Sequence, residues 1–191
     1  HALIPFLKDS IFEVSVYTSR PERWAKTINL EWHDPSGKVL GTYSGDLKTI
    51  SNNPEDLFPD ADYIVFCMPV HKYRVALQKI APFINKDKTV FVGTVYGQGG
   101  WNWMVDEIKK QYGLTKIVTF AFGLIPWICR IIEYGHTGVT YGCKAVNYAA
   151  TYPMDYFNQV NEELLEYICY KWFGKGKVEQ SDNFLSLTLS V

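Results

Sequence analysis

The clearest element in the pattern of apolar and polar positions is an unbroken β-favouring run from Tyr63 to Cys67, which predicts a strand covered on both faces. Asp62 precedes this run, and Met68-Pro69 ends it, because proline lacks the N–H group that a β-ladder needs. Residues 72–83 then carry apolar side chains at helical spacing. We therefore expect a central strand of an open α/β sheet, whose carboxyl end is where such sheets bind ligands.

The remaining periodicities predict a chain in which strands and helices alternate. Strands are expected at residues 12–17, 28–32, 38–43, 47–51, 88–93, 116–122 and 177–180, and short antiparallel edge strands at residues 130–134, 138–141 and 144–149. Helices are expected at residues 1–8, 72–83, 101–112 and 154–173, with short helical turns from Pro21 and from Asn53. The turn Asp34-Pro35-Ser36-Gly37 predicts a hairpin. Together these elements indicate an α/β fold with a doubly wound, mostly parallel sheet and added antiparallel edge strands.

The ends of the chain suggest a piece of a longer polypeptide. No Met opens the sequence, residues 1–8 already read as the middle of a helix, and residues 183–191 stop inside an apolar periodic segment. We interpret residues 1–181 as one dinucleotide-binding domain of a larger two-domain protein. Residues 182–191 would then begin a helix that leads into a C-terminal substrate domain.

The composition of the chain argues against several classes of binding partner. The chain is 47% hydrophobic and 20% charged, and its net charge of −1 offers no basic excess for nucleic acid. No apolar run approaches the roughly 20 residues of a membrane span, so a membrane is not expected as a partner. The four cysteines contain no CxxC pair, which favours reduced thiols and a cytoplasmic location. Histidines, cysteines and carboxylates do not recur at ligand spacing, so we expect no metal site.

Polar residues after the strand at 12–17 suggest a nucleotide site. In a doubly wound unit the second strand ends at the adenosine ribose, where an acid binds the 2′-hydroxyl group or an arginine accommodates a 2′-phosphate. The sequence places Thr18, Ser19, Arg20 and Arg23 there, with no acid before Glu22. These four residues predict cofactor binding with a preference for NADP, and NAD is kept as the alternative. The other interpretation of this segment is a solvated turn.

Two loops at the ends of predicted parallel strands should line the cofactor cleft. The first follows the strand at 63–67, and the second, at residues 94–100, is glycine-rich and leads into a helix. This second loop is not a GxGxxG motif, and a plain flexible connection remains an equal interpretation. The residues of these loops that we predict to bind the cofactor are Cys67, Met68, Pro69, Thr94 and Tyr96, and Val70 should line the same cleft. Pro126, which follows a third predicted strand, is predicted to bind the cofactor as well.

Several other residues could be mistaken for catalytic or ligand-binding residues. His71 could face the cleft, but without an acid partner it reads as a polar residue at a helix start. Arg130 and Glu133 are predicted to form a structural ion pair in preference to a clamp for a substrate carboxylate. His33 and His136 fall in predicted hairpin turns and should be solvated. The tryptophans are expected to pack in the core or at a domain interface, namely Trp101, Trp103, Trp127 and Trp172. Cys67, in a buried strand without nearby positive charge, should be an inert thiol.

The segment Pro126-Trp127-Ile128-Cys129-Arg130, continued by Glu133 and Gly135, resembles a motif of the opine dehydrogenase family, which includes the octopine and nopaline dehydrogenases. The resemblance runs from His1 to about Val191 and is to the Rossmann-like cofactor domain of that family. It implies that the family's glycine-rich phosphate loop lies upstream of His1. It also implies that the catalytic histidine, in a His-Pro context, lies beyond Val191. The catalytic residues are therefore unknown within this chain.

The resemblance further implies an oxidoreductase that uses NADH or NADPH. In that family an α-keto acid and the amine of an amino acid form an imine, and hydride from the cofactor reduces it. The expected partners are these small molecules, with a homodimer left open, and we expect the chain by itself to be inactive. Two alternatives stay open: a reductase of the glycerol-3-phosphate or ketopantoate type, and a nucleotide-binding module without catalysis.

Overall fold

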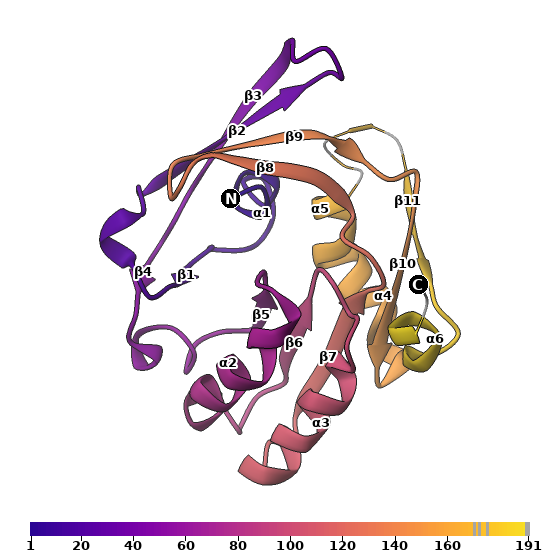
Figure 1. Ribbon diagram of the computed structural model, residues 1–191. Helices are drawn as coiled ribbons and strands as arrows, with labels where there is room; N and C mark the ends of the chain where they lie inside the picture. The colour runs from indigo at the N-terminus through magenta and orange to yellow at the C-terminus, as the bar shows by residue number, and fades with distance from the viewer. Residues whose placement is uncertain (170, 172, 175, 190–191) are drawn as a thin grey trace. The chain divides into compact units, whose positions relative to one another are not determined.

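The computed structural model describes residues 1–169, 171, 173–174 and 176–189, and these divide into two units (Figure 1). Unit 1 consists of His1–Asn53, Pro126–Val146 and Asn161–Lys177. Unit 2 consists of Pro54–Ile125, Asn147–Val160 and Val178–Val191. The predicted single domain over residues 1–181 stays a prediction. Within the described residues, every helix is too short or too polar to traverse a bilayer.

Unit 2 is built on a five-stranded sheet in the order β11-β10-β7-β6-β5. The bounds are β5 Tyr63–Phe66, β6 Val90–Thr94, β7 Ile117–Phe122, β10 Val146–Tyr152 and β11 Lys177–Gln180. Strands β5, β6 and β7 run parallel, and β10 pairs antiparallel with β7. Every residue of β6 and β7 is buried. These two strands therefore form the core of unit 2.

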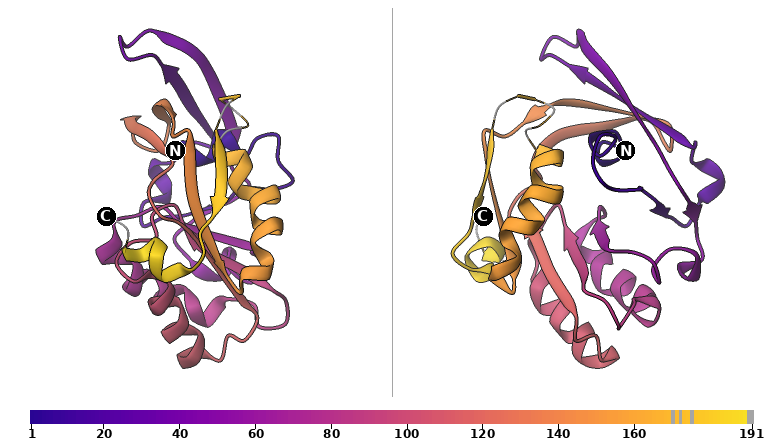
Figure 2. Two further views of the ribbon diagram at one scale, coloured as in Figure 1. Left: turned by 90° about the vertical axis from the view of Figure 1, so that its right-hand side faces the viewer. Right: turned by 180° about the vertical axis from the view of Figure 1, so that it is seen from behind.

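Helices cover both faces of this sheet (Figure 2). On one face lie α2 (Tyr73–Ile80), which follows the 3-10 turn η3 (Val70–Lys72) and continues into η4 (Ala81–Phe83), and α3 (Trp101–Tyr112). There the ring of Phe66 packs against those of Tyr73 and Trp101. On the other face Phe91 contacts Tyr156 in the turn η5 (Met154–Tyr156), which leads into α4 (Phe157–Val160). The doubly wound α/β class predicted from the sequence is thus confirmed.

The predicted position of the strand at 63–67 is wrong. Among the described strands, β5 stands at the end of the sheet order and not at its centre. Tyr63 and Val65 are half-buried, whereas Ile64 and Phe66 are buried, so only one face of the strand is well covered. Cys67 lies beyond the strand and is exposed. A short apolar run is compatible with an edge strand as well as with a central one. At this edge the Tyr63 ring is partly shielded from solvent, because it stacks on the ring of Phe91 with centroids 4.5 Å apart.

Unit 1 contains a four-stranded sheet in the order β3-β2-β9-β8 and a two-stranded parallel sheet of β1 and β4. The bounds are β1 Val16–Tyr17, β2 Thr27–His33, β3 Val39–Asp46, β4 Ile50–Ser51, β8 Trp127–Glu133 and β9 Thr137–Cys143. The predicted hairpin is confirmed, because β2 and β3 pair antiparallel. The strands predicted at 130–134 and 138–141 were expected at the edge of the main sheet, and this is wrong: β9 pairs with β2. Only the third, observed as β10, joins the main sheet.

The remaining helices are short. Unit 1 begins with α1 (Leu3–Phe6) and contains η1 (Pro21–Arg23), and unit 2 contains η2 (Pro54–Asp56) and α6 (Phe184–Leu189). Residues 161–169 continue α4 as a π-helical turn η6 (Asn161–Leu165) and α5 (Glu166–Cys169). The helix predicted over 154–173 is confirmed as far as Cys169, and Trp172 lies outside the described residues.

Candidate cofactor-binding site

The predicted ribose-binding residues form one polar turn in unit 1. β1 ends at Tyr17, and the chain passes through Thr18 and Ser19 into η1, whose first residue is Pro21. The backbone N–H of Arg20 donates a hydrogen bond of 3.3 Å to Thr18 Oγ1, which closes the turn. Ser19, Arg20 and Arg23 are exposed and Thr18 is half-buried. The turn therefore holds both guanidinium groups at the surface.

A residue that the sequence analysis missed, Tyr134, lies beneath both arginines. The guanidinium carbon of Arg23 lies 4.8 Å from the centroid of the Tyr134 ring, and that of Arg20 lies 5.8 Å from it. Trp24 Nε1 donates a hydrogen bond of 3.3 Å to the phenol oxygen. The hydrogen bond with Thr18 lowers the pKa of Tyr134, helped by the bond from Trp24 and then by the two arginine charges. No local signal could have identified this contact, because Trp24 and Tyr134 are 110 residues apart.

The two arginines of this turn make no ion pair among the described residues, although Glu22 lies between them along the chain. Guanidinium groups bind phosphate through parallel N–H donors, and two of them close to one ring make a site for a dianion. The turn can thus accept an anionic group such as a phosphate. The same described residues contain no cluster that could hold a metal ion.

In unit 2 the loops after β5 and β6 are tied together by Thr94, which is fully buried. Its hydroxyl group donates to the carbonyl oxygen of Phe66 at 3.0 Å and accepts from the N–H of Tyr96 at 3.2 Å. Tyr73 Oη lies 2.7 Å from Thr94 Oγ1 and 2.9 Å from the carbonyl oxygen of Tyr96. Thr94 therefore sets the shape of the two loops from within the core. Its predicted contact with a cofactor stays a prediction.

The residues that the first loop presents are accessible. Cys67, Met68 and Pro69 are exposed, and Tyr96 in the second loop is half-buried. Although exposed as a residue, Cys67 has its sulfur closely surrounded by protein, and this desolvation raises the pKa of the thiol. The pKa values of the Cys129 and Cys169 thiols are raised for the same reason. These shifts agree with inert thiols.

The glycines of the second loop approach other protein segments. Gly97 donates its N–H to the carbonyl oxygen of Phe122 at 2.7 Å, and a Cβ atom at Gly97 would lie 2.7 Å from the Cβ of Ala121. A Cβ atom at Gly99 would lie 2.5 Å from Cγ1 of Val70 in the first loop. Both glycines are therefore needed for packing within unit 2. The plain flexible connection considered from sequence does not describe this loop.

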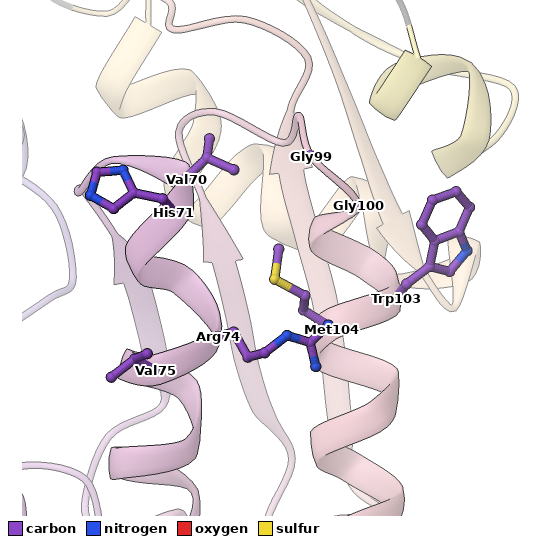
Figure 3. A pocket seen from close by; sticks show the side chains of 8 residues that line it. All are labelled: Val70, His71, Arg74, Val75, Gly99, Gly100, Trp103 and Met104. Atoms are coloured by element: carbon purple, nitrogen blue, oxygen red, sulfur yellow. The ribbon is translucent and has the colours of Figure 1, made fainter.

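A pocket of about 480 Å³ lies beside these loops, between the first turns of α2 and α3 (Figure 3). It is lined by Val70, His71, Arg74, Val75, Gly99, Gly100, Trp103 and Met104. Arg74 forms an ion pair with Glu107 across the two helices. His71 lies in η3 and is exposed, as expected for a polar residue at a helix start. Trp103 is 57% exposed and therefore lies outside the core, so that only the interface alternative remains for it, whereas Trp101 and Trp127 are buried.

The motif around Trp127 is structural in unit 1. Pro126 is buried, and its carbonyl oxygen accepts the N–H of Lys144 at 2.9 Å. The Trp127 indole N–H donates to the carbonyl oxygen of Ile168. The predicted ion pair of Arg130 with Glu133 is wrong for the described residues: Arg130 donates to the carbonyl oxygen of Cys129 at 2.7 Å instead. The register of β8 shifts between Ile131 and Glu133, so this segment does not keep the regular geometry of a strand.

The two histidines predicted to lie in hairpin turns differ in their exposure to solvent. His33 is the last residue of β2, and its Nε2 lies 2.7 Å from a carboxylate oxygen of Glu31. Its side chain is only 17% exposed, so its predicted solvation is wrong. His136 lies between β8 and β9 and is exposed, as predicted.

Comparison with known proteins identifies relatives for this architecture. No protein-family model matches the chain. An opine dehydrogenase from Haliotis discus hannai is 30% identical over 129 residues, and a tauropine dehydrogenase from Arabella iricolor is 33% identical over 128 residues. Each alignment covers 64% of this chain and 31% of the relative. The structure of octopine dehydrogenase with NADH and L-arginine matches 98% of the chain with a TM-score of 0.78 at 19% identity.

The chain therefore resembles dehydrogenases of the opine type in sequence and octopine dehydrogenase in fold, as the sequence motif indicated. It spans about a third of the length of these curated relatives and covers 47% of the octopine dehydrogenase chain.

Proposed function

We propose that this chain is the cofactor-binding part of a nicotinamide-dependent dehydrogenase of the opine type. The protein would join an α-keto acid to an amino acid by reducing the imine that they form. The observation that carries this proposal is the sequence similarity to two dehydrogenases of this type, together with the octopine dehydrogenase fold. The bound cofactor would supply hydride, while the protein would orient cofactor and imine.

NADPH is the proposed cofactor in preference to NADH. Enzymes that select NADH place an acid at the end of the second strand, whereas arginine accommodates the 2′-phosphate of NADPH. We assign that role to the turn after β1, which holds Arg20 and Arg23; both are exposed and lack a carboxylate ion-pair partner among the described residues. Ser19 and Thr18 add hydroxyl groups beside them. This arrangement fits a phosphate better than it fits a ribose hydroxyl.

The proposed contacts of unit 2 with the cofactor come from the loops after β5 and β6. Cys67, Met68 and Pro69 are exposed at the carboxyl end of β5, where open α/β sheets bind ligands. Tyr96 is half-buried at the end of β6. We assign proton transfer to none of the described residues.

Cofactor titration tests the preference. The full-length protein and its R20A/R23A variant are titrated with NADPH and with NADH. The double variant should lose NADPH affinity about 30-fold or more, since each charge-assisted hydrogen bond contributes about 1.5–3 kcal/mol, and should keep its NADH affinity. K38A, which removes an exposed cation from the β2–β3 turn of the same unit, is the control. An equal loss for both cofactors would refute the assignment.

Activity is tested on the full-length protein. Oxidation of NADPH is followed with pyruvate and a panel of amino acids, and separately with ketopantoate. Turnover that requires both the keto acid and the amine supports the opine reaction. Turnover with ketopantoate alone would support the reductase alternative instead.

A further inference from the structure

The β8–β9 turn carries Tyr134 to the polar turn at Arg20, and its backbone is held there. The carbonyl oxygen of Gly135 accepts the N–H of Ala25 at 2.9 Å. The N–H of Gly135 donates to His1 Nε2 at 2.6 Å. Gly135 has φ +78 and is buried, and a Cβ atom there would overlap the backbone of Arg23. The position of Tyr134 is thus set by its neighbour.

The ring of Tyr134 is also held by side chains. Trp24 donates to the phenol oxygen, and the two rings meet edge to face with centroids 5.7 Å apart. His1 stacks on Trp24 at 4.8 Å and meets Tyr134 edge to face at 5.7 Å. Thr18 also interacts with the phenol, which lowers the pKa of Tyr134. A ring with this many contacts has little freedom to rotate.

Both arginines use this ring in the same way. A guanidinium group that lies over an aromatic ring makes its attraction through its flat face, and the N–H donors at its edge stay free. Arg20 and Arg23 are exposed, so without the ring each would sample many rotamers. Ordering such a side chain on binding costs about 0.5–1.5 kcal/mol. A preformed contact with Tyr134 removes part of this cost before an anion arrives.

We infer that Tyr134 is a positioning residue for cofactor specificity: its ring orients the guanidinium groups of Arg20 and Arg23 toward the 2′-phosphate of NADPH. This inference rests on the proposed function, because it names the residue that prepares the proposed phosphate site. Tyr134 selects between cofactors without being required to contact either of them. The ring face carries this role, and the hydroxyl group only anchors the ring.

The test uses two small probes that differ in the 2′-phosphate. The full-length protein is titrated calorimetrically with adenosine 2′,5′-bisphosphate and with adenosine 5′-monophosphate. Y134L should weaken binding of the bisphosphate about 5- to 30-fold, which corresponds to two exposed cation–π contacts, and leave the monophosphate within about twofold. Y134F keeps the ring and should restore selectivity to within about threefold of wild type. Y141L, which removes an exposed tyrosine from β9 of the same sheet, is the matched control.

The outcomes separate the two proposals. If R20A/R23A loses selectivity and Y134L keeps it, the phosphate site stands and the role of Tyr134 is refuted. If R20A/R23A also keeps the selectivity of wild type, the proposed NADPH site itself is wrong. If Y134L weakens both probes equally, or Y134F behaves as Y134L does, the ring is only structural or the hydroxyl carries the effect, and the inference fails. Thermal unfolding of each variant identifies losses that come from misfolding.

Discussion

A Cβ atom added to Gly135 would lie 2.8 Å from the carbonyl carbon of Arg23 and closer still to its oxygen. The β8–β9 turn can therefore pack on the arginine turn only because residue 135 has no side chain. The positive φ of Gly135 imposes the same requirement independently. Glycine at the end of the segment from Pro126 to Gly135 is thus explained physically, because it lets Tyr134 lie against the two arginines.

Replacing Gly135 should separate these two turns. G135A should lower the free energy of unfolding by about 1–2 kcal/mol because of the positive φ. It should lower it by about 1–3 kcal/mol more because the new Cβ atom overlaps backbone that cannot move aside. Urea unfolding measures the sum. The control is G37A, because Gly37 also has a positive φ but a Cβ atom there meets nothing within 4 Å. Equal losses in the two variants would show that the Arg23 contact costs nothing.

The hydroxyl group of Thr94 should be needed for stability. T94V removes a donor and an acceptor in a fully buried position and leaves the carbonyl oxygen of Phe66 and the N–H of Tyr96 without this partner. We expect a loss of about 1–3 kcal/mol in the free energy of unfolding. T94S keeps the hydroxyl group and should lose less than T94V. If the serine variant is the less stable one, packing of the methyl group dominates over the hydrogen bonds.

Tyr73 should make the protein sensitive to alkali. Burial raises the pKa of Tyr73 above its usual value of 10.0, and the hydrogen bond with Thr94 only partly opposes this. The folded state then holds the phenol proton more tightly than the unfolded chain does. The stability from this group is complete below pH 10 and is lost as the pH rises further.

The comparison of wild type with Y73F isolates the contribution of Tyr73 ionisation to stability. Urea midpoints measured from pH 8 to about pH 11 should fall more steeply for wild type than for Y73F, because phenylalanine has no proton to lose. Y112F, at the C-terminal end of α3, serves as the control for loss of a tyrosine. Parallel curves for wild type and Y73F would contradict the raised pKa.

Gln98 should hold α6 to the glycine loop. Its Nε2 donates to the carbonyl oxygens of Gly123 and Leu187, both at 2.9 Å. Q98A should lower the stability of the α6 contact by about 1–2 kcal/mol and speed amide hydrogen exchange in residues 184–189. Q98E should be worse than Q98A, because a carboxylate faces two carbonyl oxygens. Q78A, on the exposed side of α2, should leave exchange in α6 unchanged.

The sequence by itself determined the elements whose signals are local. Helix α3 has the predicted bounds because glycines with positive φ flank it and its buried residues recur at helical spacing, namely Trp101, Met104, Val105 and Ile108. The β2–β3 hairpin follows from its turn residues. The turn at Arg20 was also found from sequence, since strand, polar turn and arginine lie within a few residues of one another.

Only the tertiary structure decided which segments meet. Strand order depends on long-range pairing, so an apolar run could not show that β5 stands at the end of the described sheet while β6 and β7 fill the centre. The short distance between Arg130 and Glu133 along the chain suggested a pair, but β8 is irregular between them and Arg130 donates to the carbonyl oxygen of Cys129 instead. Tyr134 reaches Arg20 and Arg23 because β9 pairs with β2 and Gly135 permits close contact with Arg23. A contact across more than a hundred residues leaves no periodicity in the sequence, and packing alone reveals it.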